Sequence, residues 1–150
     1  KALNFVNTQM ARKIAADGEG AEHLLVCTVQ GAKDEQSARK LAKSVISSSL
    51  VKAAFFGKDA NWGRILCAMG YSGELFDPQK VSVSFTNSKG CIKVFDHGTP
   101  VDFDEDKAKI LLTEKEVGIL VLLEEGEASG TAWGCDLTYE YVKINGDYRT

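Results

Sequence analysis

Apolar segments of strand length alternate with apolar stripes of helical spacing in the first half of this chain, and that alternation limits the fold more than any other feature. Residues 3–16 carry apolar side chains at the spacing of an amphipathic helix, and residues 24–29 form a short apolar run typical of a strand. A second helical stripe follows Asp34, which can cap it, and a third begins at Trp62. We expect the compact apolar segment at residues 50–56 to be a strand or the approach to one.

Strand pairs dominate the second half of the chain. Residues 81–85 alternate apolar with polar side chains, and residues 92–95 return after a turn as the partner strand of a hairpin. Asp104 can cap a short helix, and residues 117–123 and 129–135 indicate a second hairpin. We therefore predict a mixed α/β (α+β) fold, a layered sandwich in which helices pack on a sheet and the C-terminal half is rich in hairpins.

The size and charge of the chain argue against several classes of protein. A chain of 150 residues is long enough to bury its own core, so residues 1–150 are predicted to form a single domain. Its net charge of −3 and its lack of a basic run argue against a nucleic-acid partner. Residues 117–123 are the longest apolar run and are far too short to span a membrane, so no membrane partner is expected.

The pattern of cysteines and histidines predicts no metal site. The four cysteines are scattered without a close pair, whereas zinc ligands come in closely spaced pairs. A disulfide framework is the alternative, but we expect reduced and mostly buried thiols, with Cys27 and Cys135 in core strands. His23 and His97 have no other ligand type at a useful spacing, and His97 lies in a predicted turn.

Residues 136–150 are polar, aromatic and charged to the last position. Apolar and polar side chains mix between Leu137 and Ile144, which predicts that this segment packs onto the domain. Held in that way, the amide of Asn145 and the hydroxyl of Thr150 could recognise a ligand. The alternative is a surface tail with local hydrogen bonds, as at most chain ends.

Two further motifs place polar side chains beside a helix end. Asp17-Gly-Glu-Gly20 follows the first predicted helix, and the structural alternative for Glu19 is a solvated acid at a helix C-cap. Before the third helix, Asp59 or Asn61 can cap the free backbone N–H groups. Arg64 can make a forked contact with a carboxylate, either of a substrate or of the protein itself.

Three segments of the chain, residues 14–21, 50–65 and 136–150, resemble the ornithine acetyltransferases in their order and separation. The resemblance covers nearly the whole chain. It implies an acyltransferase of arginine biosynthesis that moves acetyl from N-acetylornithine to glutamate through an acetyl-threonine intermediate.

The resemblance implies that this chain recognises substrate and does no bond-making chemistry. Glu19, Asn145 and Thr150 match the substrate-binding positions of the family. A carboxylate is a natural partner for an ammonium group of ornithine. The supporting positions that the resemblance marks are Asp59, Asn61 and Arg64.

The catalytic nucleophile of the family is a threonine that follows an alanine at a self-cleavage site. No Ala-Thr pair occurs in this chain, and its first residue is Lys1. We therefore expect the C-terminal part of the β subunit, inactive when isolated, with the nucleophile upstream and no catalytic residue in this chain. The implied partners are the α subunit and the remainder of the β subunit, which assemble after autocatalytic cleavage into heterotetramers.

The resemblance also limits the small molecules that the enzyme would use. N-acetylornithine, ornithine and glutamate are the implied substrates, no resident cofactor is expected, and acetyl-coenzyme A is a co-substrate of some relatives. Bacterial relatives are cytoplasmic and fungal relatives lie in the mitochondrial matrix. The alternative function is that of a non-catalytic subunit, either an amino-acid-binding module or a structural one.

Overall fold

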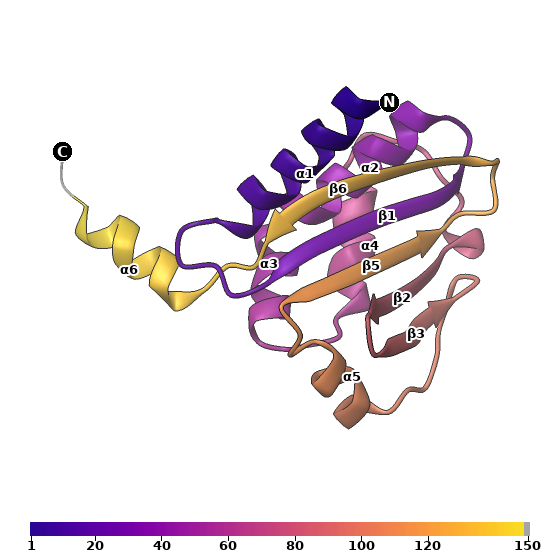
Figure 1. Ribbon diagram of the computed structural model, residues 1–150. Helices are drawn as coiled ribbons and strands as arrows, with labels where there is room; N and C mark the ends of the chain where they lie inside the picture. Colours follow the sequence, from indigo (N-terminus) through magenta and orange to yellow (C-terminus); the bar gives the residue numbers. More distant parts are fainter. Residues whose placement is uncertain (149–150) are drawn as a thin grey trace.

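The structure, a computed structural model, describes residues 1–148 and holds one sheet with helices on both faces (Figure 1). The elements are, in order, α1 (Ala2–Ala16), β1 (Leu24–Ala32), α2 (Glu35–Ser47), α3 (Ser49–Phe56), α4 (Trp62–Gly70), a 3-10 turn (Pro78–Lys80), β2 (Ser82–Asn87), β3 (Gly90–Asp96), β4 (Thr99–Pro100), α5 (Glu105–Leu111), β5 (Glu116–Leu122), β6 (Ala128–Cys135) and α6 (Tyr139–Asp147).

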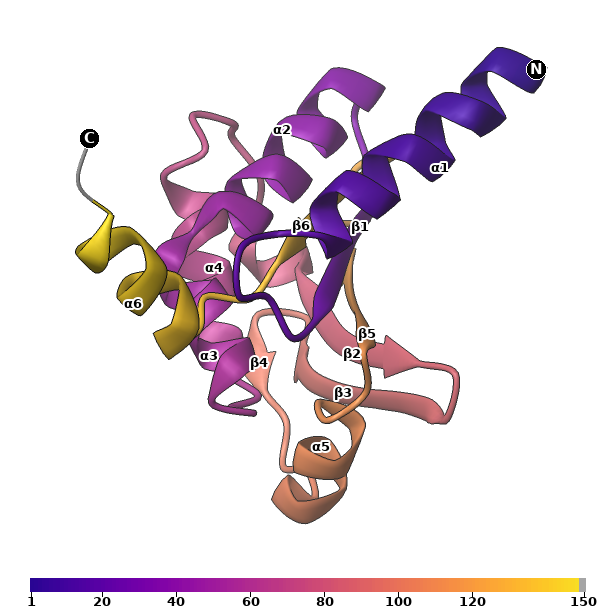
Figure 2. The same ribbon diagram turned by 60° about the vertical axis from the view of Figure 1, so that its left-hand side comes forward.

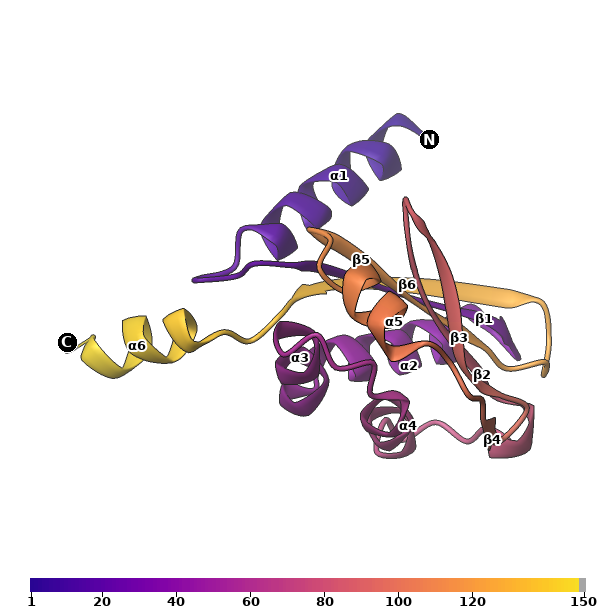
Figure 3. The ribbon, with the colours of Figure 1, turned by 90° about the horizontal axis from the view of Figure 1, so that it is seen from below.

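The six strands form a single mixed sheet in the order β4-β3-β2-β5-β1-β6. Strands β1 and β5 run parallel, and every other neighbouring pair is antiparallel. Figure 3 shows α2, α3 and α4 together on one side of the sheet and α1 on the other. The layered mixed fold that the sequence predicts is confirmed.

The core lies between one face of the sheet and helices α2, α3 and α4. Leu25, Cys27 and Val29 alternate along β1 and have no exposed surface, and they pack in one cluster with the α2 residues Leu41 and Val45. Burying a large apolar side chain of this kind contributes about 1.5–3 kcal/mol to folding. Burial also raises the pKa of the Cys27 thiol to about 12, so this cysteine is an inert core residue.

The second predicted hairpin is wrong, although both of its strands exist. Strand β1 lies between β5 and β6 and pairs with both, for example Leu25 with Val117 of β5 and with Gly134 of β6. The connection from β5 to β6 passes the end of β1, where Glu125 N–H donates to the carbonyl of Gly31 over 2.7 Å. Alternating apolar and polar residues identify a strand but not the strand that pairs with it. The closeness of β5 and β6 in sequence therefore did not predict their partners in the sheet.

The segment at residues 50–56 is a helix, α3, and not a strand. Ser48 caps it by accepting a hydrogen bond from the Val51 N–H, and the buried residues Val51, Ala54 and Phe55 follow helical spacing. A short apolar run fits a strand or a buried helix equally well by periodicity, and here the cap selects the helix.

The two terminal helices differ from the rest because neither buries a residue of its own. The large apolar residues of α1 are exposed, with 71% of Ile14 accessible. The prediction that the C-terminal segment packs onto the domain is wrong for α6, since Tyr139 is 81% and Val142 62% exposed, and Figure 1 shows this helix extending away from the sheet. Within residues 1–148, no helix combines the length and apolar character needed to cross a bilayer.

All four cysteines are free, but the expectation that they are mostly buried holds only for Cys27. Cys67 and Cys91 are exposed, and Cys135 is half-buried in β6.

A polar cluster around Glu74 connects helix α2 with the loop that follows α4. The Glu74 carboxylate is largely buried and accepts hydrogen bonds of 2.8 Å from both Lys40 Nζ and Ser37 Oγ, with Lys33 Nζ 3.5 Å away. These contacts, that of Lys40 first, lower the pKa of Glu74 from 4.5 to about 2. A carboxylate with a lowered pKa stabilises the folded state at higher pH, and this stabilisation is lost as the pH falls through that pKa.

Replacing Glu74 by Gln should therefore lower the melting temperature at pH 7, and the difference from wild type should shrink as the pH falls from about 4.5 towards about 2. Thermal unfolding followed by circular dichroism over this range measures the effect. Glu127→Gln is the matched control, because Glu127 is exposed and makes no side-chain hydrogen bond within residues 1–148. A Glu74→Gln deficit that does not vary with pH would contradict this role of the carboxylate.

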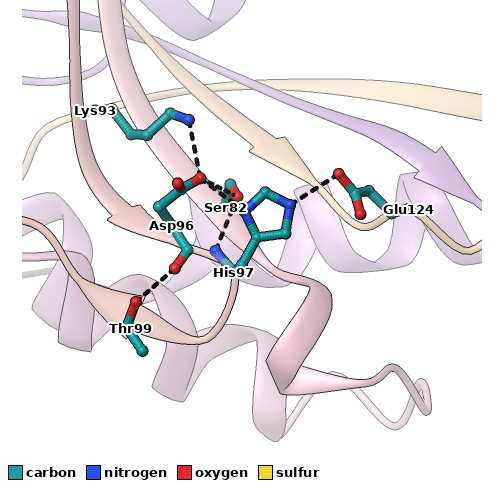
Figure 4. A network of polar contacts seen from close by, with 6 residues as sticks. All are labelled: Ser82, Lys93, Asp96, His97, Thr99 and Glu124. Carbon is teal, nitrogen blue, oxygen red and sulfur yellow. Dashed lines mark hydrogen bonds and ion pairs between the residues drawn. The ribbon is translucent and has the colours of Figure 1, made fainter.

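A second polar cluster joins the β3–β4 turn to the β5–β6 connection (Figure 4). His97 Nε2 lies 3.0 Å from Glu124 Oε1, and His97 Nδ1 lies 3.0 Å from Asp96 Oδ1. The same Asp96 oxygen accepts from Lys93 Nζ over 2.8 Å and from Ser82 Oγ over 2.9 Å. Both ring nitrogens of His97 face a carboxylate, and only the protonated ring can donate to both.

Glu124 and, after it, Asp96 raise the pKa of His97 above its ordinary value of 6.5. A histidine with a raised pKa stabilises the fold fully below pH 6.5, and the contribution disappears as the pH rises through the higher folded-state pKa.

Because Glu124 is the main cause of the raised pKa, Glu124→Gln should lower the pKa of His97, as measured by NMR titration of the ring protons. Glu127→Gln should leave it unchanged, and an equal response to both substitutions would show that Glu124 is not the cause.

Candidate functional site

The loop between α1 and β1 packs against the connection from β6 to α6, at one end of the sheet. Figure 2 shows this loop passing beside the start of α6. Thr138 Oγ1 donates to the carbonyl of Gly20 over 2.7 Å, and the backbone N–H groups of Glu22 and His23 donate to Asp136 Oδ1 over 2.9 and 3.0 Å. Two segments more than a hundred residues apart in sequence are thereby joined by polar contacts.

Glu19 and Asn145 meet in this region. Asn145 Nδ2 donates to Glu19 Oε2 over 2.8 Å, across 126 positions of sequence, and to the carbonyl of Tyr141 over 2.9 Å. Both side chains are exposed, so a ligand could reach them. The structure thus brings together two of the three residues for which the sequence resemblance implies substrate contact, and the third, Thr150, lies outside the described residues.

Glycine at position 20 permits this close approach. Gly20 has a positive φ of 64°, and a Cβ added there would lie 2.9 Å from both Glu140 Cβ and the backbone nitrogen of Tyr141. A larger residue would strain the backbone and push the loop away from α6. The glycine of the Asp17-Gly-Glu-Gly20 motif therefore serves tertiary packing as well as the turn.

The supporting residues Asp59, Asn61 and Arg64 form a local structure at the start of α4. Asn61 is the N-cap, since its Oδ1 accepts from the Arg64 N–H over 3.1 Å, and its Nδ2 donates to Asp59 Oδ2 over 3.0 Å. Arg64 Nη1 donates to the carbonyl of Leu50 over 2.9 Å, and this contact, not a forked carboxylate contact, is the one the structure shows. None of the three forms a hydrogen bond with Glu19 or Asn145 within residues 1–148.

Helix α3 connects the two groups of residues. Arg64 contacts the first turn of α3 at Leu50, and the Leu137 N–H donates to the carbonyl of Lys52 over 3.3 Å. The ring of Tyr139 meets the ring of Phe56 edge-on with centroids 5.2 Å apart. Arg64 at the start of α4 is therefore connected to the start of α6 through contacts with α3, and not directly.

A cluster of the exposed Glu22 with the buried His23 and Asp136 was missed by the sequence reasoning, which treated His23 as isolated. Donor atoms of the three residues lie within 4.8 Å of one another, a separation that could suit a metal ion. However, both oxygens of Asp136 already accept hydrogen bonds from the protein, including one from His23 Nδ1 over 2.7 Å. The carboxylate is therefore satisfied without a metal. The only sequence signal was that each residue lies beside an apolar strand.

The exposed part of the site suits a cationic amino acid. The hydrogen bond to Asn145 uses Oε2 of Glu19, and among residues 1–148 no hydrogen bond occupies the other carboxylate oxygen or the Asn145 amide oxygen, both of which are acceptors. An ammonium group has three donors and gains a charge-assisted bond from a carboxylate. The pair can therefore orient a ligand amine.

Known proteins resemble this chain over its whole length. The model of the ArgJ family matches residues 1–150. The chain is 54% identical over 150 residues to the arginine biosynthesis bifunctional protein ArgJ of Caldanaerobacter subterraneus subsp. tengcongensis, covering all of this chain and 37% of that protein. It is 51% identical over 150 residues to a glutamate N-acetyltransferase of Methanopyrus kandleri, covering all of this chain and 38% of that protein.

A solved structure has the same fold. The crystal structure of the arginine biosynthesis bifunctional protein ArgJ from Bacillus halodurans superposes with a TM-score of 0.92 at 42% identity, over 98% of this chain and 68% of that one. This chain thus spans little more than a third of the length of the curated relatives it matches. With a family match along all 150 residues and this agreement in fold, the chain belongs to the ArgJ family.

Proposed function

We propose that this chain is the substrate-recognition part of an acetyltransferase of arginine biosynthesis that moves acetyl from N-acetylornithine to glutamate. Family membership supports the reaction class, because relatives are named as ArgJ bifunctional proteins and as a glutamate N-acetyltransferase. The observation that carries the recognition role is the 2.8 Å contact between Glu19 and Asn145. Tertiary structure has brought two implied substrate residues together on an exposed surface.

Recognition would depend on the charge of ornithine. Glu19 accepts hydrogen bonds from an ammonium group of the substrate, and the amide oxygen of Asn145 adds a second acceptor. Thr150 is the third proposed contact and rests on the resemblance alone. Asp59, Asn61 and Arg64 support the site by shaping the start of α4, which touches α3. Positioning of this kind can lower a reaction barrier by about 7–11 kcal/mol in favourable cases.

The bond-making groups belong to a part of the enzyme outside this chain. A threonine hydroxyl attacks the acetyl carbonyl of N-acetylornithine, the amide bond breaks, and ornithine leaves with the proton. The amine of glutamate then attacks the acetyl-threonine ester, which yields N-acetylglutamate and restores the hydroxyl. Acetyl-coenzyme A is an additional donor if the enzyme is bifunctional, and no resident cofactor is needed.

The whole enzyme would contain more than this chain. In the proposed assembly, autocatalytic cleavage produces an α and a β subunit that pair into a heterotetramer, with this chain as the C-terminal part of β. The isolated chain would be inactive. A cytoplasmic or mitochondrial location follows from the source of the enzyme and stays a prediction.

Substituting Glu19 in the full-length enzyme tests the proposal. Glu19→Gln keeps the shape of the side chain and removes its charge. The KM for N-acetylornithine should rise about 10- to 100-fold, which corresponds to the free energy of a hydrogen bond to a charged group. Steady-state kinetics with N-acetylornithine and glutamate measure the change.

Asp17→Asn is the matched control, because Asp17 is an exposed acid of the same loop that makes no side-chain hydrogen bond within residues 1–148. It should leave the KM within about twofold, the scale of a surface substitution. Equal KM values for wild type and Glu19→Gln would remove the recognition role and favour a purely structural subunit.

A further inference from the structure

Helix α6 carries Asn145 but buries none of its own residues, and its contacts through Tyr139 and Asn145 are made by exposed side chains. The buried contacts that hold it lie immediately before its first turn. Thr138 and Asp136 are both 3% exposed, and each contacts the loop between α1 and β1 that carries Glu19. The relative position of Glu19 and Asn145 therefore depends on two buried polar side chains.

Asp136 ties the loop to the sheet by three hydrogen bonds. Its Oδ1 accepts from the backbone N–H groups of Glu22 and His23, and its Oδ2 accepts from His23 Nδ1 over 2.7 Å. Its own N–H donates to the carbonyl of His23 over 3.3 Å, which extends the β1–β6 pairing by one step beyond Leu24 and Cys135. A buried carboxylate left without these donors would be strongly destabilised, so the loop is held firmly.

The single hydroxyl of Thr138 contacts both the loop between α1 and β1 and the first turn of α6. Its Oγ1 donates to the carbonyl of Gly20 over 2.7 Å, next to Glu19, and accepts from the Tyr141 N–H over 3.2 Å, which makes it the N-cap of α6. The same atom therefore sets the start of the helix that carries Asn145 and the position of the loop that carries Glu19. An N-cap satisfies a backbone N–H that the first turn of a helix leaves without a partner.

We propose that His23, Asp136 and Thr138 form a polar clasp that positions Glu19 against Asn145 and thereby sets the affinity of the enzyme for its amino-acid substrate. This inference rests on the recognition role proposed above. The three clasp residues are buried and act through Glu19 and Asn145, so they are positioning residues and not catalytic ones. None of them was a site candidate on sequence grounds.

The clasp is tested in the full-length enzyme with a pair of substitutions at Thr138. Thr138→Val keeps the volume and removes the hydroxyl, whereas Thr138→Ser keeps the hydroxyl. Thr138→Val removes both neutral hydrogen bonds of the hydroxyl, so it should raise the KM for N-acetylornithine about fivefold or more, with kcat within about twofold of wild type. Thr138→Ser should restore the wild-type KM.

A double-mutant cycle separates positioning from general stability. If Thr138 acts through Glu19, Thr138→Val should raise the KM far less in a Glu19→Gln background than in wild type, because the group it positions is already lost. Thr113→Val, which removes a threonine hydroxyl from the end of α5, is the control for an unrelated hydrogen bond and should leave the KM unchanged. Multiplicative effects of Thr138→Val and Glu19→Gln would overturn the clasp.

The results also separate the clasp from the proposed function. A raised KM in Glu19→Gln with a wild-type KM in Thr138→Val and Asp136→Asn overturns the clasp and leaves the function standing. A wild-type KM in Glu19→Gln overturns both. Asp136→Asn should raise the KM more than Thr138→Val does, because it removes the buried charge and the oxygen that accepts from His23 Nδ1, and hydrogen bonds to charged groups are stronger than neutral ones. If that variant fails to fold, the Val and Ser variants of Thr138 decide the question alone.

Discussion

Strand β1 pairs with β5 along one edge and with β6 along the other, while its alternate side chains Leu25, Cys27 and Val29 are completely buried. Its position therefore determines where the segments attached to it can go. The antiparallel register places Leu24 opposite Cys135, and one step further along it places His23 opposite Asp136. The candidate site begins where the pairing of β1 with β6 ends. This pairing therefore brings together the loop before β1 and the segment after β6, which build the site.

The two ends of the sheet are stabilised by different polar contacts. At the site end, a buried aspartate and a buried threonine accept and donate backbone hydrogen bonds, which are directional and hold the loop and α6 in one arrangement. At the other end, where β1 and β5 finish, His97 and Glu124 form an exposed pair that links two turns. Exposed pairs contribute little to stability, so the His97 cluster orders its turns more than it strengthens the fold.

Helix α6 combines an exposed surface with a well-defined starting point. It buries no residue, yet Thr138 caps it and Asn145 contacts Glu19. Segments with few buried apolar contacts open at low free-energy cost, and ligand-binding segments are often of this kind. In the proposed function, a substrate that bridges Glu19 and Asn145 would add contacts to this exposed helix.

Local chemistry in the sequence determined most of the elements and their caps, because Asp34, Asn61 and Asp104 cap helices through hydrogen bonds within three residues. The motif resemblance also pointed to Glu19 and Asn145, whose side chains are in contact in the structure, and their substrate-binding role stays a prediction. Only the tertiary structure decided that β1 separates β5 from β6, that α6 stands away from the core, and that His23 meets Asp136 across 113 positions. Those outcomes depend on which strands pair and in which register, and that choice minimises the free energy of the whole sheet and not of any single segment.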